Sequence, residues 1–145
     1  MLHQSLDELR LKADILPLQS EPRLLTRAER RERWAQLLDR HDVPLIPFQR
    51  IETYSKTARG SLRVDHGPVA LAYDDPVLRA DGLAGDTLGD ACAYFELSPG
   101  LAHRLLCDCQ YRGTMTGPKV AAKLRAAEHG GIFWHVLNWA FHRNR

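Results

Sequence analysis

The sequence predicts a mainly α-helical protein, with one compact multi-helix domain over residues 1–145 and a short β-hairpin inserted near residues 61–73. Three observations predict this fold class. Apolar residues recur at helical spacing along most of the chain, helix-capping residues precede several of these stretches, and prolines or glycines separate them. A chain of 145 residues has the length of one ordinary domain. It contains no internal repeat and no long low-complexity linker.

The composition narrows the class of protein. Twenty Lys and Arg against eighteen Asp and Glu leave a formal charge of +2, far from the basic excess of a dedicated nucleic-acid binder. No apolar run is long enough to cross a membrane, and charges interrupt the N-terminal stretch where a signal peptide would be continuous. Three cysteines argue against a secreted disulfide framework. We therefore expect a cytoplasmic protein.

Capping boxes predict the first two helices. Ser5 and Glu8 form the first box, and the helix that follows covers residues 6–16 and ends at Pro17. Thr26 and Glu29 form the second box. The apolar stripe of this second helix is Trp34, Leu37, Leu38 and His41.

An arginine face occupies the first half of this second helix. Cations near a helix N-terminus oppose the helix dipole, so these side chains do not serve to stabilise that end. A solvated face is the ordinary interpretation of such a run. The alternative is a surface that contacts an acidic partner or phosphates, for which Arg27, Arg30 and Arg31 are the candidate residues.

The middle of the chain predicts a helix and then the hairpin. Residues 48–59 show apolar residues at helical spacing, and Gly60 is placed to end that helix. Two short extended runs, "SLRV" and "VALAY", then flank a turn that contains Gly67 and Pro68, which is the pattern of a β-hairpin. Because one hairpin alone is marginally stable, it must pack on the helices.

An acidic stretch follows the hairpin, from Asp74 to Asp90. Asp75 before Pro76 predicts an N-cap and the first residue of a short helix that ends at Gly82. The loop spacing of an EF-hand calcium site is missing, so helix capping explains these carboxylates better than a bound ion does.

Residues 87–106 resemble a helix-turn-helix in outline. The first helix begins at Thr87, and Ser98 with Pro99 opens the second. In a DNA-binding version, the N-terminal part of the second helix meets base edges, and His103 and Arg104 would be the contacting residues here. Two features weaken this alternative: Glu96 replaces the usual turn glycine, and few basic residues surround the motif.

The last part of the chain predicts one helix over "PKVAAKLRAAEHG", ended by Gly130 and Gly131, and then an aromatic tail. As a helix, the tail is apolar almost all round, so we expect it to dock on the domain or on another subunit. Trp134, His135, Trp139 and His142 are the candidate interaction residues of this tail.

The stretch "HRLLCDCQY" contains the candidate thiol or metal site: His103, Cys107 and Cys109. On a continuous helix Cys109 points about 200° away from Cys107, so the two thiols converge only if the helix ends near Asp108. Cys92, His129, His135 and His142 are candidates for a fourth ligand. The paired spacing of recognisable zinc sites is absent, and we expect two small buried residues at the end of a core helix.

No catalytic or cofactor motif is specific enough to name a reaction, so we expect no cofactor and no enzyme. The first hypothesis is a small regulatory or interaction module that binds a protein partner or itself through helical surfaces. A DNA-binding regulator built on residues 87–106 is the second, with nucleic acid not favoured as a partner. A thiol or metal sensor at His103, Cys107 and Cys109 is the third.

Overall fold

The computed structural model describes residues 23–49 and 59–142, with side chains up to Gly130. This part of the chain is mainly helical, as the sequence predicts. Its elements are α2 (Arg27–Asp39), α5 (Pro68–Asp74), α6 (Pro76–Asp81), α7 (Leu88–Tyr94), α8 (Pro99–Leu106), a 3₁₀ helix η1 (Asp108–Gln110) and α9 (Gly117–His142). The expected helix over residues 6–16 lies outside the described residues.

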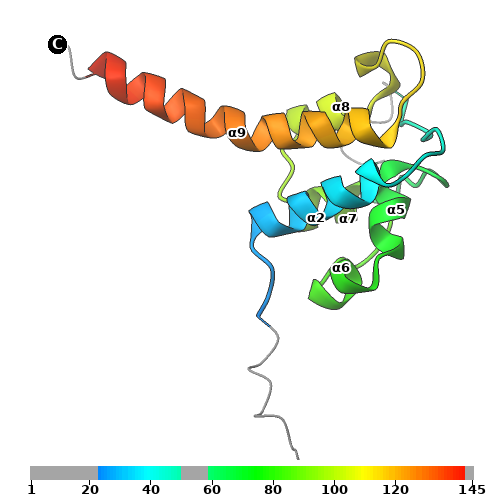
Figure 1. Ribbon diagram of the computed structural model, residues 1–145. Coiled ribbons are helices and arrows are strands. Elements are labelled where there is room, and N and C mark those ends of the chain that lie inside the picture. Colours follow the sequence, from blue (N-terminus) through cyan, green and yellow to red (C-terminus); the bar gives the residue numbers. More distant parts are fainter. Residues whose placement is uncertain (1–22, 50–58, 143–145) are drawn as a thin grey trace, which may run out of the picture.

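Helices α2 and α9 lie side by side and form the largest helix pair (Figure 1). Between α2 and the shorter helices, the buried Trp34 ring stacks on Phe95 with 4.3 Å between ring centroids. The indole of Trp34 also donates a hydrogen bond of 3.0 Å to the carbonyl of Pro68, at the start of α5. Trp34 therefore joins α2 to two segments that are distant in sequence.

The capping signals that begin α2, α6 and α8 are confirmed, whereas Asp81 and Asp86 of the acidic stretch are not caps and pair with Arg30 and Arg63. Thr26 and Glu29 form a reciprocal capping box on α2, and Thr87 forms one with Asp90 on α7. Asp75 caps α6, and Ser98 caps α8. Proline follows both of these caps at the first helical turn, where its missing N–H costs nothing.

The predicted β-hairpin at residues 61–73 is wrong. The part of the chain that the structure describes contains no strand pairing beyond one isolated bridge, and residues 68–74 form helix α5. Gly67 serves as its N-cap and Pro68 begins its first turn, while Val69 and Ala72 face the core at helical spacing. A short apolar run such as "VALAY" fits a buried helix as well as a strand, and here the proline favours the helix.

Helix α9 does not end at Gly130 and Gly131, where the sequence predicts a stop. It continues to His142, and its second half extends beyond the other helices (Figure 1). Glycine is tolerated inside a helix at a cost of about 1 kcal/mol relative to alanine, so two glycines weaken the helix without ending it. None of the helices in the described ranges is both long and apolar enough to span a membrane.

The helix expected over residues 48–59 is not formed at its start. Phe48 is buried and extended, and it makes the isolated bridge, a parallel pairing with Cys107. Residues 50–58 lie outside the described part of the chain. The bridge between Phe48 and Cys107 determines the geometry of the candidate site.

Candidate thiol and metal site

Helix α8 ends at Leu106, immediately before the first cysteine of the candidate site. The Cys107 N–H makes the last helical bond, to the carbonyl of His103, but the residue itself is extended, with φ −83° and ψ 139°. Phe48 explains this change, because its N–H donates to the Leu106 carbonyl at 2.9 Å and its carbonyl accepts from the Asp108 N–H at 3.0 Å. These bonds draw the chain out of the helix at Cys107.

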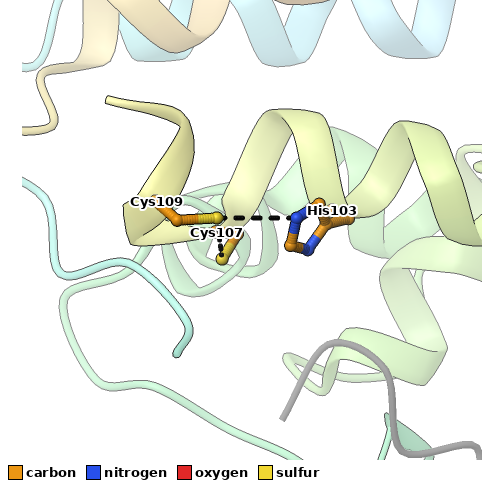
Figure 2. A group of neighbouring side chains, drawn as sticks. All are labelled: His103, Cys107 and Cys109. Atoms are coloured by element: carbon orange, nitrogen blue, oxygen red, sulfur yellow. Dashed lines mark hydrogen bonds between the residues drawn. The ribbon is translucent and has the colours of Figure 1, made fainter. Parts of the chain in front are cut away.

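Because α8 ends before Cys107, the thiols of Cys107 and Cys109 lie next to each other. After Cys107, the 3₁₀ turn η1 folds Cys109 back toward the last turn of α8 (Figure 2). Cys109 Sγ lies 3.1 Å from Cys107 Sγ and 3.5 Å from His103 Nε2. One ligand atom from each of the three residues falls within 4.8 Å of the others. The condition that the sequence sets for convergence, a helix that ends before Asp108, is therefore met.

The distances can be compared with those of a real metal centre. Tetrahedral zinc, with Zn–S near 2.3 Å and Zn–N near 2.0–2.1 Å, separates a sulfur and a nitrogen ligand by about 3.5 Å and two sulfurs by about 3.8 Å. The Cys109–His103 distance already has this value. The two sulfurs would have to separate by about 0.7 Å, which a rotation of the exposed Cys109 side chain can provide.

The two thiols have different environments. Cys107 is fully buried, whereas Cys109 is exposed. Burial, together with its hydrogen bond to Cys109, raises the pKa of the Cys107 thiol to about 12. Without an ion, Cys107 is therefore a protonated thiol that donates to Asp108 Oδ1 at 3.3 Å. A coordinating metal removes such a proton outright.

The histidine presents the nitrogen that a metal needs. His103 is buried on α8 with 8% of its surface exposed, and its Nε2 points toward Cys109 (Figure 2). The Gln110 amide nitrogen, which can only donate, lies 3.4 Å from the same Nε2. His103 Nε2 thus lies between Gln110 and Cys109, within reach of the exposed thiol of the cluster.

Gln110, Tyr111 and Lys123 support the site, although no motif in the sequence selects them. The Lys123 ammonium, on α9, donates to the Gln110 carbonyl at 2.6 Å and lies 4.0 Å from the centre of the Tyr111 ring. The Tyr111 hydroxyl donates to the Leu105 carbonyl at 2.5 Å. Together these contacts hold the turn that carries Cys109 against α8. The spacing of the residues along the chain carries no signal for them.

The outcome for the other predicted ligands is mixed. The expectation of two buried cysteines holds for Cys107 and not for Cys109. Cys92 on α7 is half-buried, and His129 lines a groove with Arg31 and Glu128; neither joins the cluster. The side chains of His135 and His142 lie outside the described residues. The described part of the chain therefore brings three candidate ligands together at this site.

The arginine face of α2 is largely engaged within the molecule. Arg31 is buried and donates to the carbonyls of Phe95 and Glu96 at 2.9 and 2.8 Å, and it also pairs with Glu128. Arg30 pairs with Asp81 at 2.8 Å. Arg27 is the most open of the three candidates, and its nearest carboxylate, Glu128, lies 3.8 Å away. Arg30 and Arg31 therefore hold α2 to the rest of the fold.

Helices α7 and α8 follow one another, with a short turn between Tyr94 and Pro99. Glu96, in the turn, has φ +51°, the left-handed conformation that glycine usually supplies. Arg104 is exposed, but His103 is buried and faces the cysteines. One of the two residues proposed for base contacts is thus turned inward. Trp134, His135, Trp139 and His142 lie on the second half of α9, where only the backbone is described.

Comparison with known proteins adds no family. No protein-family model, no curated protein and no solved structure matches the chain. The function must therefore be argued from the cluster itself.

Proposed function

We propose that the protein is a metal sensor that binds one thiophilic d¹⁰ ion, Zn²⁺ or Cu⁺, through His103 Nε2, Cys107 Sγ and Cys109 Sγ. One observation carries the proposal: the three ligand atoms lie within 4.8 Å of one another, although a continuous helix would keep the thiols apart. It acts in the cytoplasm, where a reducing environment keeps thiols available as ligands.

The ligand set supports this class of ion. Thiolates select soft or borderline metals such as Cu⁺ and Zn²⁺, and imidazole suits both, whereas Mg²⁺ and Ca²⁺ prefer oxygen. Structural zinc sites are closed by four protein ligands. Three ligands with an exposed Cys109 leave one side of the ion open, which suits reversible binding by a sensor better than a structural role.

Backbone hydrogen bonds around Cys107 connect the proposed metal site to the rest of the molecule. The bridge fixes Phe48 to Leu106 and Asp108. Further along the same segment, the Leu45 N–H donates to the Met115 carbonyl at 3.0 Å, close to the start of α9. An ion that holds Cys107 and Cys109 together therefore stabilises the junction between this segment, α8 and α9.

The test is a metal titration of reduced protein under anaerobic conditions, with Zn²⁺ and Cu⁺ in separate arms against a chromophoric competitor. We expect one ion per chain and a higher melting temperature on loading, because an ion at 100 times its dissociation constant adds about 2.7 kcal/mol to stability. The stronger arm identifies the preferred ion.

Matched cysteine variants locate the site. Cys109→Ser removes an exposed ligand without opening a cavity, and we expect it to weaken binding by more than about 100-fold, since even outer-shell partners of a ligand are worth 10- to 100-fold. Cys92→Ser makes the same chemical change outside the cluster and should bind as the wild type does. Equal affinity for the wild type and Cys109→Ser, or no stoichiometric binding in either arm, would refute the proposal.

A second candidate function, binding of a protein partner or of a second copy, is favoured by the part of α9 that extends past the other helices (Figure 1). The aromatic tail lies on this extension. Size-exclusion chromatography with light scattering tests it: we expect an assembly that Trp139→Ala dissociates. A strictly monomeric wild type that captures no partner would remove this candidate.

A further inference from the structure

We infer that Cys107 and Cys109 also form a reversible disulfide when a hydroperoxide oxidises them, and that this bond expels the metal ion. The ion-release step rests on the proposed function, whereas formation of the disulfide does not. The site would then report on two signals, a thiophilic metal and an oxidant, which exclude each other.

The distance between the sulfurs carries the inference. Their separation is 3.1 Å, about 1 Å longer than the 2.03–2.05 Å of a disulfide bond and about 0.7 Å shorter than the edge of a zinc tetrahedron. The distance between the sulfurs thus lies between its value in a disulfide and its value in a zinc-bound pair. Both are reached by movement of Cys109, which is exposed on a 3₁₀ turn, while Cys107 stays fixed in the core by its bridge to Phe48.

Exposure also assigns the order of the steps. A hydroperoxide from solvent reaches Cys109 Sγ, whereas Cys107 Sγ is covered. In the first step, Cys109 sulfur displaces water from hydrogen peroxide and becomes a sulfenic acid, so sulfur loses two electrons and the O–O bond is reduced. In the second, Cys107 sulfur attacks Cys109 sulfur, the S–S bond forms, and the hydroxyl leaves with the Cys107 proton as water.

The overall reaction is balanced by one peroxide: two thiols and one hydrogen peroxide give one disulfide and two waters. When the sulfurs start as metal-bound thiolates, two protons come from solvent and the ion is released. A sulfur bonded to sulfur no longer offers the anionic thiolate that a metal requires. A dithiol reductant reverses the change by thiol–disulfide exchange.

The third cysteine serves as an internal control. Cys92 lies on α7, outside the cluster, and burial raises the pKa of its thiol. Cys92 is not part of the pair of adjacent thiols, and it is less exposed than Cys109. Oxidation should therefore link Cys107 to Cys109 and leave Cys92 as a free thiol.

The experiment adds one equivalent of hydrogen peroxide to reduced, metal-free protein and counts thiols after denaturation. We expect the three free cysteines of the wild type to fall to one, with the intact mass lower by two hydrogen atoms and peptide mapping that joins Cys107 to Cys109. Cys92→Ser should fall from two thiols to none, and Cys109→Ser should form no intramolecular disulfide. A dithiol should restore every thiol.

A second arm treats the zinc-loaded protein with peroxide and follows free Zn²⁺ with a chelator dye, where one ion per disulfide is expected. An unchanged thiol count, a disulfide to Cys92, or chains linked to one another would overturn the inference while leaving metal binding intact. Disulfide formation in a protein that binds no metal when reduced would refute the proposed function and its release step, but would support the redox pair. The two failures are thus distinguishable.

Discussion

Replacement of Gly117 by alanine should destabilise the protein strongly, because α9 begins where it touches the backbone of α2. A Cβ atom at Gly117 would lie 1.9 Å from the Leu38 carbonyl oxygen and 2.8 Å from its carbon. A carbon–oxygen contact needs about 3.3 Å, so the two helices would have to separate by about 1.4 Å at this point. The obstacle is backbone, and no side-chain rotation relieves it.

Overpacking of a core commonly costs about 1–3 kcal/mol, and this clash is at the severe end, so we expect a loss of about 3 kcal/mol. With an m-value of about 2 kcal/mol/M, the midpoint of urea unfolding falls by about 1.5 M, which circular dichroism measures. Gly100→Ala is the matched control, since its Cβ meets nothing within 4 Å, and it should be neutral or stabilising by up to about 1 kcal/mol. Equal midpoints for the two variants would refute the α2–α9 packing.

Two further predictions concern the polar contacts of α2. Arg31→Met should cost about 2–5 kcal/mol in urea unfolding, because it leaves the carbonyls of Phe95 and Glu96 and the Glu128 carboxylate without their buried partner; a loss below about 0.5 kcal/mol would contradict this role. Asp75→Ala should cost about 0.5–2 kcal/mol at pH 7 through loss of the α6 cap. The hydrogen bond from Arg33 holds the pKa of Asp75 below the ordinary 3.8. The ionised Asp75 carboxylate therefore stabilises the fold above about pH 4, and this stabilisation is lost as the pH falls through the lower folded-state pKa. The acid limb of the stability profile should therefore be shallower in Asp75→Ala than in the wild type, and parallel limbs would contradict the ion pair.

The sequence predicted the features that depend on neighbouring residues. The capping box at Thr26 and the proline starts after Asp75 and Ser98 are local patterns, and the helices begin where these residues predict. The hairpin prediction failed because "VALAY" fits a strand or a buried helix, and because it places Pro68 in a turn between strands, whereas Pro68 begins the first turn of α5.

The candidate site depended on a contact that no local pattern carries. The three ligands could be selected from the sequence, and the angular argument identified what their convergence requires. Whether the helix ends early is decided by Phe48, whose backbone pairs with Leu106 and Asp108 from a distant part of the chain. The role of the arginine face is likewise set by remote carboxylates, such as Asp81 for Arg30.

X-ray absorption of the zinc-loaded, reduced protein measures the central claim most directly, because it reports the atoms bound to the ion. The account predicts one zinc per chain with two sulfur ligands at about 2.3 Å and nitrogen or oxygen ligands at about 2.0–2.1 Å, of which one sulfur is lost in Cys109→Ser. A first shell that contains only nitrogen and oxygen, or the same two sulfurs in Cys109→Ser, would contradict a metal centre built from His103, Cys107 and Cys109.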